Sequence, residues 1–392
     1  MAATPAELTA AVNGQALFVV DLLKALYQKD KNLVLSPYSL VSALALLLPG
    51  TDGESRFEIA RVIFDQAAKD ASAADRHVEL FAQTNDANLK TNSETLRIAN
   101  LLYSHLSFPL NPQYVATLTK RLRAVAKELD FVGKNDVALA TINSDVSEAT
   151  KGLIPSLLDS IDPATRVILV NAIHFKGLWA RQFDKSLTAA DADFTKSNGQ
   201  VVKAALMYKK AKFPFYYDEE SKAKFVQLDY KPEGGNIAMV VVLPDAGTTL
   251  ESYIRNSLKA ATLQEKLQLL ATDADVRLKL PRFKLESTHY LSGPLQGLGV
   301  RSVFGPKADL SKLSSASQQL YVDQVIQKAV IEVNEEGTEA AAATAIMMRC
   351  LMLSPEEEFT ADRPFLYMLV AQHGSARQIL FVGTVEDPTK SQ

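Results

Sequence analysis

The sequence predicts an α+β fold in which helices come first and strands follow, rather than a regular alternation of the two. Helical periodicity dominates the first 130 residues, and apolar runs rich in branched residues dominate the chain after residue 143. No linker, low-complexity tract or internal repeat divides the sequence. A length of 392 residues favours two or three domains, but we expect one interleaved domain over residues 1–392.

The segments with helical spacing lie in the first part of the chain. Ala16–Leu26 is amphipathic, and Ser39–Leu48 is apolar nearly all round, so the second helix should be buried. Asn111–Leu129 begins with an N-cap residue followed by proline, which suits the first helical position. We also expect helices at Glu54–Phe64 and Ala74–Phe81 and extended pieces at Asn32–Pro37 and Leu96–Tyr103.

Strands are expected in the rest of the chain. Val167–Phe175 is a nearly continuous run of branched apolar residues, which is typical of a strand covered on both faces. His174 lies inside this run, so we interpret it as a structural histidine. The other expected strands are Phe225–Leu228, Ile237–Leu243, Val276–Leu280, Leu320–Asn334 and Arg377–Val385.

The bulk composition argues against several classes of protein. A net charge of -3 gives no general attraction to nucleic acid or to anionic membranes. The single cysteine, Cys350, permits no internal disulfide. No run of about 18 uninterrupted apolar residues is present, and Met1–Asp21 lacks the basic start of a signal peptide. Two compartments stay open, because the protein is either intracellular or secreted with its leader removed.

The sequence also lacks the patterns of an enzyme. Its five histidines form no HExxH or HxH pair, and it has no GxSxG or GxxxxGK[ST] motif. His77-Val78-Glu79 resembles half of a deaminase motif whose PCxxC half is absent. Cys350 has no histidine near it in the sequence. We therefore expect no catalytic residue, no metal and no cofactor.

Residues Glu335–Phe365 form the most informative segment. Small residues over Thr338–Ala345 precede a bulky apolar run, Ile346–Leu353, and acidic residues flank both. One interpretation is a buried helix, because Ala, Met and Leu are good helix formers. The acidic, turn-like flanks favour instead a segment held away from the body of the protein.

The small residues of this segment also suit a conditional strand. Every second residue from Thr338 would lie on one face of such a strand, and these residues are Thr338, Ala340, Ala342 and Thr344. All four are small, so this face could enter a folded sheet without overfilling the core. Gly337 supplies a pivot with free backbone angles. The pattern therefore predicts a strand that adds to a sheet of its own chain.

These residues resemble the hinge of inhibitory serpins, and further serpin-like motifs follow in the same order over nearly the whole chain. The hinge positions are Glu336, Gly337, Thr338, Glu339, Ala340, Ala341, Ala342, Ala343 and Thr344. The other motifs are Asn32–Ser39, Leu48–Ser55, Val170–Trp179, Leu280–Lys284, Ala308–Ser311, Asp362–Phe365 and Phe381–Gly383. The resemblance implies the serpin fold, with helices packed on three β-sheets and an exposed reactive-centre loop at about residues 335–360.

The resemblance also implies a polar cluster that controls opening of the main sheet. Its members are Ser36, Ser39, Asn171 and Gln327. Gln327 departs from the family, which usually has histidine at this position. Its amide donates and accepts hydrogen bonds but does not titrate. Asp145 is a second departure, at a position where the family usually has tryptophan, and both bear on the ease of sheet opening.

For function, the resemblance implies a suicide-substrate inhibitor that traps a protease as an acyl-enzyme. The attacked bond usually lies fourteen residues past the hinge glycine, which gives Leu351–Met352. A leucine there suits the apolar pockets of chymotrypsin-, cathepsin G- or elastase-like proteases. Arg349–Cys350 is the alternative for a trypsin-like protease, and cleavage after Met352 would suit a papain-like cysteine protease.

The expected partner is a target protease bound covalently to a monomer, with no nucleic acid or membrane. A weak polyanion site is a further hypothesis, although a solvated helix face is the simpler interpretation of its four residues, Lys120, Arg121, Arg123 and Lys127. The main rival is a non-inhibitory serpin that acts as a carrier or chaperone. Such relatives tend to have bulky, charged or proline residues at the inward hinge positions, and this hinge has small ones.

Overall fold

The computed structural model describes residues 4–64, 76, 78–85, 95–122, 124–231, 236–316, 319–337 and 356–391. Contacts divide the chain into two compact units whose segments alternate along the sequence. Unit 1 comprises Met1–Leu26, Leu35–His174 and Ser287–Val330, and unit 2 comprises Tyr27–Val34, Phe175–Glu286 and Ile331–Gln392. The single interleaved domain stays a prediction.

The helices of unit 1 begin at the signals that the sequence contains. Helix α1 (Pro5–Gly14) starts at a capping box, in which Thr4 and Glu7 exchange hydrogen bonds. Helix α3 (Pro37–Leu47) starts at the N-cap Ser36 and is buried at every residue, as its apolar sequence predicts. The remaining helices of unit 1 include α2 (Ala16–Leu26), α4 (Gly53–Ile63), α6 (Pro112–Thr117), α7 (Asn135–Ala149) and α10 (Ser292–Leu298).

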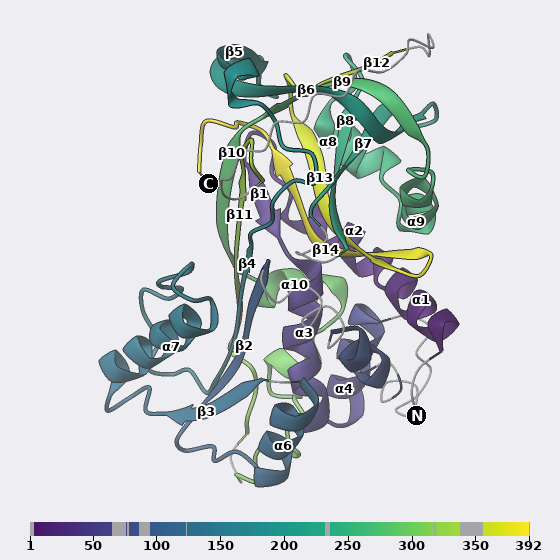
Figure 1. Ribbon diagram of the computed structural model, residues 1–392. Coiled ribbons are helices and arrows are strands. Elements are labelled where there is room, and N and C mark those ends of the chain that lie inside the picture. Colours follow the sequence, from purple (N-terminus) through teal and green to yellow (C-terminus); the bar gives the residue numbers. More distant parts are fainter. Residues whose placement is uncertain are drawn as a thin grey trace. The chain divides into compact units, whose positions relative to one another are not determined.

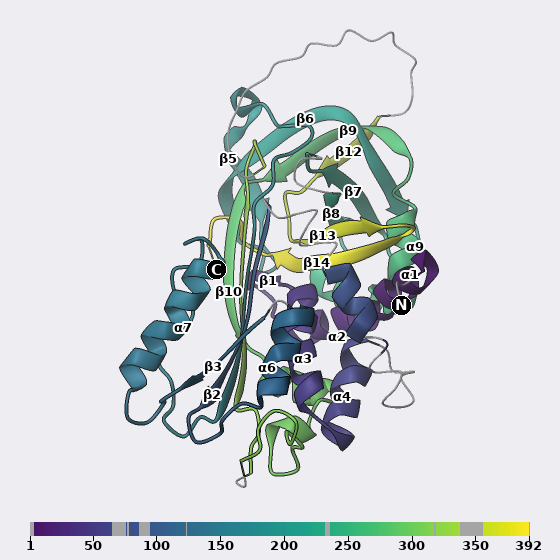
Figure 2. The same ribbon diagram turned by 60° about the horizontal axis from the view of Figure 1, so that its bottom comes forward.

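One sheet has five strands in the order β10-β11-β4-β2-β3. All nine residues of β4 (Val167–Phe175) are buried, which confirms that this strand is covered on both faces. Figure 2 shows α7 on one face of the sheet and α3 on the other. The other strands are β10 (Phe283–Tyr290), β11 (Gln324–Val333), β2 (Leu96–His105) and β3 (Val125–Leu129).

Strands β4 and β11 are neighbours and run in the same direction. The side chain of Asp323 accepts a hydrogen bond from the Val167 backbone N–H at 3.1 Å. Further along, the Gln327 side chain donates to Asn171 at 2.8 Å. Both contacts join residues 156 apart in sequence, and a constant offset means a parallel pair. Parallel pairing is slightly weaker per residue than antiparallel pairing.

The face of β4 and β11 that lies toward α7 is covered by the chain that follows this helix. Ile154 and Leu158 pack in one buried cluster with Ile168 of β4 and Ile326 of β11. The cluster also contains Ile142 of α7 itself. Any strand entering between β4 and β11 would therefore have to displace this cover.

A second sheet has nine strands, and β6 (Val201–Asp218) joins its two parts. Leu206–Pro214 of β6 pair with β9, and Phe215–Asp218 pair with β7. The three sheets expected are therefore two continuous sheets, because β6 pairs with both β7 and β9 and joins two of them. The pairing order is β1 (Leu33–Leu35), β14 (Ala376–Val385), β13 (Phe365–His373), β8 (Ile237–Pro244), β7 (Ala223–Asp229), β6, β9 (Asp273–Pro281) and β12 (Glu357–Thr360), with β5 (Ala189–Thr195) also on β6.

The helix expected at Asn111–Leu129 is wrong in its second half. The Asn111 cap and the proline start are confirmed, but helical structure ends at Leu122, after a π-helical turn. Val125–Leu129 instead forms strand β3, which pairs in parallel with β2. Pairing with a neighbouring strand overrides local helix propensity here.

One described stretch, Thr9–Leu26, is long and apolar enough to cross a membrane by length and composition. It spans α1 and α2 and is 44% buried. The buried residues of α2 include Phe18, Leu22 and Leu23. Core helices of soluble proteins pass the same test, so the stretch is weak evidence for a membrane segment.

Candidate functional site at the hinge and in the five-stranded sheet

The chain reverses direction directly after β11, in a four-residue turn that opens the predicted hinge. The backbone groups of Asn334 and Gly337 exchange two hydrogen bonds, both 3.3 Å long, and form an antiparallel bridge. The Asn334 side chain accepts a third bond from the Glu336 N–H at 3.0 Å. The turn therefore directs the chain back along β11.

Gly337 lies at the end of this turn in a position that only glycine can occupy. Its φ is +103°, a conformation that residues with a side chain rarely adopt. A Cβ atom there would lie 2.6 Å from both the Leu178 Cα and the Trp179 N. These are backbone atoms, so no change of rotamer relieves the clash. The pivot expected at Gly337 is thus a tightly fixed point.

Residues 179–185 hold the turn in place. The Trp179 indole donates to the Asn334 carbonyl at 2.9 Å, and its backbone N–H donates to the Glu336 carbonyl at 3.0 Å. Trp179 also stacks on Tyr230 with ring centroids 4.3 Å apart. Lys185 forms an ion pair with Glu336. The turn is therefore fixed through both its backbone and its side chains.

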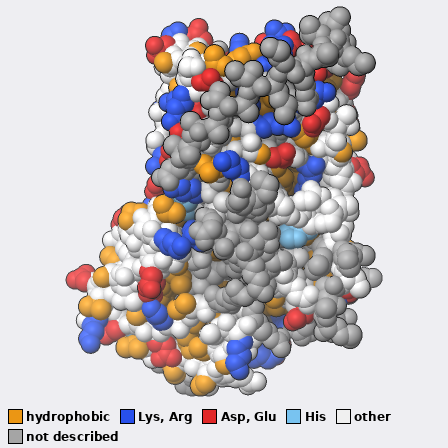
Figure 3. Space-filling model, in the orientation of Figure 1, with side chains coloured by type: hydrophobic (Ala, Val, Ile, Leu, Met, Phe, Trp, Pro, Cys, Tyr) orange, Lys and Arg blue, Asp and Glu red, His pale blue; other side chains and the backbone are white. Residues whose placement is uncertain are grey.

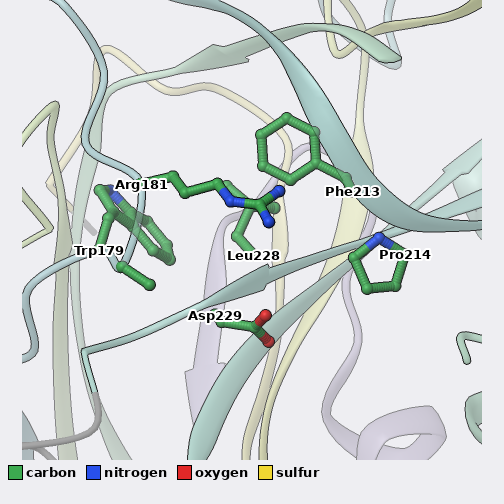
Figure 4. Close-up of a pocket in the computed structure, with 7 residues that line it drawn as sticks. Trp179, Arg181, Phe213, Pro214, Leu228 and Asp229 are labelled. Carbon is green, nitrogen blue, oxygen red and sulfur yellow. The ribbon is translucent and has the colours of Figure 1, made fainter. Parts of the chain in front are cut away.

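A small pocket lies behind Trp179 (Figure 4). Its lining includes Trp179, Arg181, Phe213 and Leu228, and its volume of about 20 Å³ has room for little more than one water molecule. It is therefore too small for an organic ligand or a cofactor. Among the described residues, no group of three or more His, Cys, Asp or Glu could hold a metal ion.

Glu335 is a buried carboxylate in the middle of the turn, with an exposed fraction of 1%. Its Oε1 accepts from the Arg282 Nε and from the Thr188 hydroxyl, both at 2.6 Å. Burial acts to raise the pKa of Glu335, but these hydrogen bonds outweigh it and hold the pKa below its usual range. The carboxylate therefore stays ionised and anchors the turn to Arg282, between β9 and β10, and to Thr188, directly before β5.

A recess of about 500 Å³ lies beside the turn and is lined by charged residues. Each of its basic side chains faces an acidic one across the recess. The pairs are Arg282–Glu335, Lys185–Glu336 and Lys284–Glu332. Because these charges are paired, the recess has no strong preference for an ion of either sign.

The four residues of the predicted polar cluster lie together and are fully buried. The Gln327 Nε2 donates to the Ser36 carbonyl at 2.9 Å and to the Asn171 Oδ1 at 2.8 Å, and its Oε1 accepts from the Ser36 N–H at 2.9 Å. The Ser39 hydroxyl donates to the Asn171 Oδ1 at 2.6 Å. The cluster thus joins the N-terminus of α3 to both β4 and β11.

The structure describes the predicted reactive-centre loop at its two ends. The hinge residues from Thr338 to Thr344 and the candidate reactive residues lie outside the described part of the chain. The reactive residues are Arg349, Cys350, Leu351 and Met352. The described part of the expected loop is therefore the turn at its start and the strand β12 at its end.

The four basic residues expected on one helix face do not all lie on a helix. Lys120 is exposed in the π-helical turn, and Lys127 lies on β3. The Lys127 Nζ contacts the two carboxylate oxygens of Asp145 at 2.7 and 2.8 Å. The Arg121 side chain and Arg123 lie outside the described residues. On the face of the molecule in Figure 3, basic and acidic side chains are interspersed.

The anchoring roles of Arg282, Thr188 and Lys185 were not predicted from the sequence. Arg282 lies within a serpin-like motif, but nothing in that motif indicates a buried acidic partner 53 residues away. Thr188 is 147 residues from the same partner. The only local signal was the acidic pair Glu335–Glu336 directly after a buried strand, where unpaired carboxylates would be costly.

Comparisons with known proteins agree with this architecture. A family model described as "Serpin (serine protease inhibitor)" matches residues 13–388. The leukocyte elastase inhibitor of Sus scrofa is 37% identical over 381 residues, which cover 95% of this chain and 97% of that protein. The human leukocyte elastase inhibitor is 35% identical over 381 residues, with the same coverage of 95% and 97%.

Solved structures match over the same extent. Human thyroxine-binding globulin in complex with thyroxine has a TM-score of 0.86 at 26% identity and covers 99% of this chain and 100% of its own. The thermophilic serpin Tengpin in its native state has a TM-score of 0.84 at 25% identity, covering 99% of this chain and 95% of its own. With the family match over nearly the full length, these results show that the chain belongs to the serpin family.

Proposed function

We propose that this serpin inhibits chymotrypsin- or elastase-like serine proteases as a suicide substrate, with Leu351–Met352 as the attacked bond. The protease serine would bond to the Leu351 carbonyl carbon, and the bond to the Met352 nitrogen would break. Met352 would leave as a new amino terminus carrying the transferred proton. The hinge released by this step would then enter the five-stranded sheet.

The observation that carries the proposal is the bridge between Asn334 and Gly337. It is already the first rung of an antiparallel ladder that the hinge can extend along β11. Continuing this register puts Thr338 opposite Val333, and Ala340 opposite Ile331. Val333 and Ile331 are both buried, so the small hinge residues would face the core, as their size requires.

The same register also indicates a hydrogen-bond partner for the far end of the inserted hinge. Thr344 would lie opposite Gln327, at the point where Gln327 bonds Asn171 across the β4–β11 pair. Opening the sheet removes that bond, and the Thr344 hydroxyl can replace the lost partner. The inserted strand would convert one parallel pair into two antiparallel pairs, which favours the inserted state.

The relatives support the choice of target. Those reported above are named leukocyte elastase inhibitors, and an apolar residue such as Leu351 suits elastase- and chymotrypsin-like pockets. Arg349–Cys350 for a trypsin-like protease and cleavage after Met352 by a papain-like protease are the alternatives. The thyroxine complex of thyroxine-binding globulin illustrates the rival role of a carrier, against which the small hinge residues argue.

The test is incubation with a panel of proteases, followed by denaturing electrophoresis and mass spectrometry of the released C-terminal peptide. The unmodified protein should form an SDS-resistant complex and release a peptide that begins at Met352. Thr338→Arg should be cleaved at the same bond without forming the complex, because its charge would face the buried Val333 on insertion.

Glu339→Arg is the matched control for this experiment. The same register puts residue 339 opposite Glu332, whose side chain is 42% exposed, so an arginine there stays in solvent. Glu339→Arg should therefore keep the SDS-resistant complex. An unmodified protein that is cut without forming any complex would instead favour the non-inhibitory rival.

A monomeric state belongs to the same proposal, and weak polyanion binding stays an alternative to a solvated surface. Lys127 is already paired with Asp145, so its charge is partly neutralised within the protein. We expect a heparin titration to leave the rate of inhibition unchanged, and sedimentation to give the mass of one chain.

A further inference from the structure

Glu356, the first described residue on the C-terminal side of the reactive-centre loop, is held by two cations from two different strands. Its carboxylate lies 2.5 Å from the Lys210 Nζ of β6 and 3.1 Å from the Arg277 Nε of β9. Lys210 and Arg277 are paired directly across the two strands, so their side chains leave the same face of the sheet. The Lys210 hydrogen bond holds the pKa of Glu356 below its usual range.

The chain is bound to the sheet from this point onward. Glu357–Thr360 pair in parallel with β9 (Figure 1). The Lys224 Nζ donates to the Glu358 carbonyl at 2.9 Å, and the Ala361 N–H donates to the Lys279 carbonyl at 2.9 Å. Glu356 is therefore the outermost fixed point on the C-terminal side of the loop.

The distance along the chain makes this end the one that limits where the reactive bond can lie. Glu356 is five residues past Leu351, and five residues span at most about 18 Å. From Gly337 to Leu351 there are fourteen residues, which span up to about 50 Å. The N-terminal tether is thus too long to define the position of the bond, whereas the C-terminal tether is short.

We propose that Glu356, Lys210 and Arg277 form an anchor that positions the reactive bond for attack by the protease. The inference rests on the proposed function. It assigns Glu356, Lys210 and Arg277 the role of positioning the loop, without contact to the reacting atoms. The anchor keeps the C-terminal side of the loop fixed, so that one bond is presented at the protease active site. After cleavage it retains that side while the hinge side moves away.

A single exposed ion pair contributes little, because solvent and salt screen it. Here two cations share one carboxylate whose side chain is only 27% exposed, and the strand that follows fixes the backbone. The anchor therefore has to restrict only a short stretch of chain. We expect effects of a few fold on the rate of attack, together with a change in which bond is cut.

The experiment compares Glu356→Gln, Lys210→Gln and the double variant, with chymotrypsin as the probe. Glu356→Gln should lower the second-order rate of loop cleavage about three- to tenfold, and its C-terminal peptides should begin at more than one residue. Lys210→Gln should have a smaller effect, because Arg277 remains. The double variant should be no slower than Glu356→Gln, since both changes remove one interaction.

Lys212→Gln is the matched control, because Lys212 lies two residues along β6, on the same face as Lys210 and opposite Asp275 rather than Arg277. It should leave the rate and the cleaved bond unchanged. High salt should lower the rate of loop cleavage in the unmodified protein toward the rate of Glu356→Gln. It should leave the rate of that variant unchanged.

Two results would overturn the anchor: cleavage of Glu356→Gln at the normal rate and at a single bond, or additive effects in the double variant. Both readouts need only cleavage, so they remain informative if no covalent complex forms and the proposed function fails. An unmodified protein that chymotrypsin does not cut within the loop would count against both proposals.

Discussion

Gln327 shows how one residue can replace another in a buried network without carrying its charge. Its amide makes two donor contacts and one acceptor contact at 2.8–2.9 Å. A neutral imidazole has one donor and one acceptor, so it could not make all three. Because the amide does not titrate, the cluster should behave identically across the physiological pH range.

Gln327→His should make stability depend on pH. Full burial disfavours the charged imidazole, so its folded-state pKa would lie below the unfolded value of about 6.5. The unfolded chain then binds more protons as pH falls, and the variant should lose about 1–2 kcal/mol relative to the unmodified protein between pH 7.5 and 5. Urea unfolding across this range measures the difference. Gln296→His, at an exposed site on α10, should show no such slope.

Arg282→Met tests the buried carboxylate of the turn. It leaves the ionised Glu335 with Thr188 as its one side-chain donor among the described residues, at a cost of about 1–3 kcal/mol near pH 7. This figure is below that of a fully buried pair, because the Arg282 side chain is 44% exposed. Urea unfolding at pH 7.5 and at pH 4 measures the loss.

The pH dependence of this variant follows from the sign of the pKa shift. In the unmodified protein the Glu335 pKa is lowered, so its stabilisation is complete above the unfolded value of about 4.3 and is lost below it. Without Arg282, burial would raise the pKa of Glu335, and protonation of this carboxylate would remove the cost of burying its charge. The deficit should therefore shrink at pH 4. Lys284→Met, which breaks the exposed pair with Glu332, should cost under about 0.5 kcal/mol at both pH values.

At the scale of elements, α7 is held to the five-stranded sheet by a polar clamp. Asp145 of α7 accepts from Lys127 of β3 and from the Tyr103 hydroxyl of β2, the latter at 2.8 Å. Burial and the hydrogen bond to Asp145 raise the pKa of Tyr103, which therefore stays a donor. The family's usual tryptophan at position 145 is thus replaced by an ionic contact.

Loosening this clamp should ease opening of the sheet. Asp145→Asn or Lys127→Met should speed hydrogen exchange across Asn135–Ala149 and speed heat-induced loss of inhibitory activity. A double-mutant cycle on the free energy of unfolding should give a coupling energy of about 0.5–1.5 kcal/mol for the two changes. Lys120→Met, which removes an exposed charge nearby, should do neither. Equal exchange in all variants would mean that the clamp does not hold α7.

Elements whose own residues decide their structure were predictable from sequence, and those decided by distant partners were not. Ala16–Leu26 and Val167–Phe175 have the predicted bounds, because their apolar patterns match their burial. Strand β6 was missed, since Val201–Asp218 is buried at few positions and contains four lysines. Val125–Leu129 was assigned to a helix, because only its pairing with β2 makes it a strand. The hinge was recognisable, but its anchoring partners lie up to about 150 residues away.

At the scale of the whole molecule, cleavage of the loop should raise thermal stability. An inserted hinge would gain backbone hydrogen bonds to both β4 and β11, each with a net contribution of about 1 kcal/mol. For a chain of this size, we expect the midpoint of unfolding to rise by roughly 15 °C or more. Calorimetry before and after limited proteolysis measures the change. A nicked protein that melts no later than the intact one would contradict insertion.

The crowding around Gly337 sets a boundary for redesign of the inhibitor. Because any side chain there meets the backbone of residues 178 and 179, exchange of loops between relatives has to begin after this glycine. Residues 346–353 can then be randomised to select new target proteases, while the glycine and the strand β12 stay as constant ends. Libraries built this way would vary specificity and leave the scaffold unaltered.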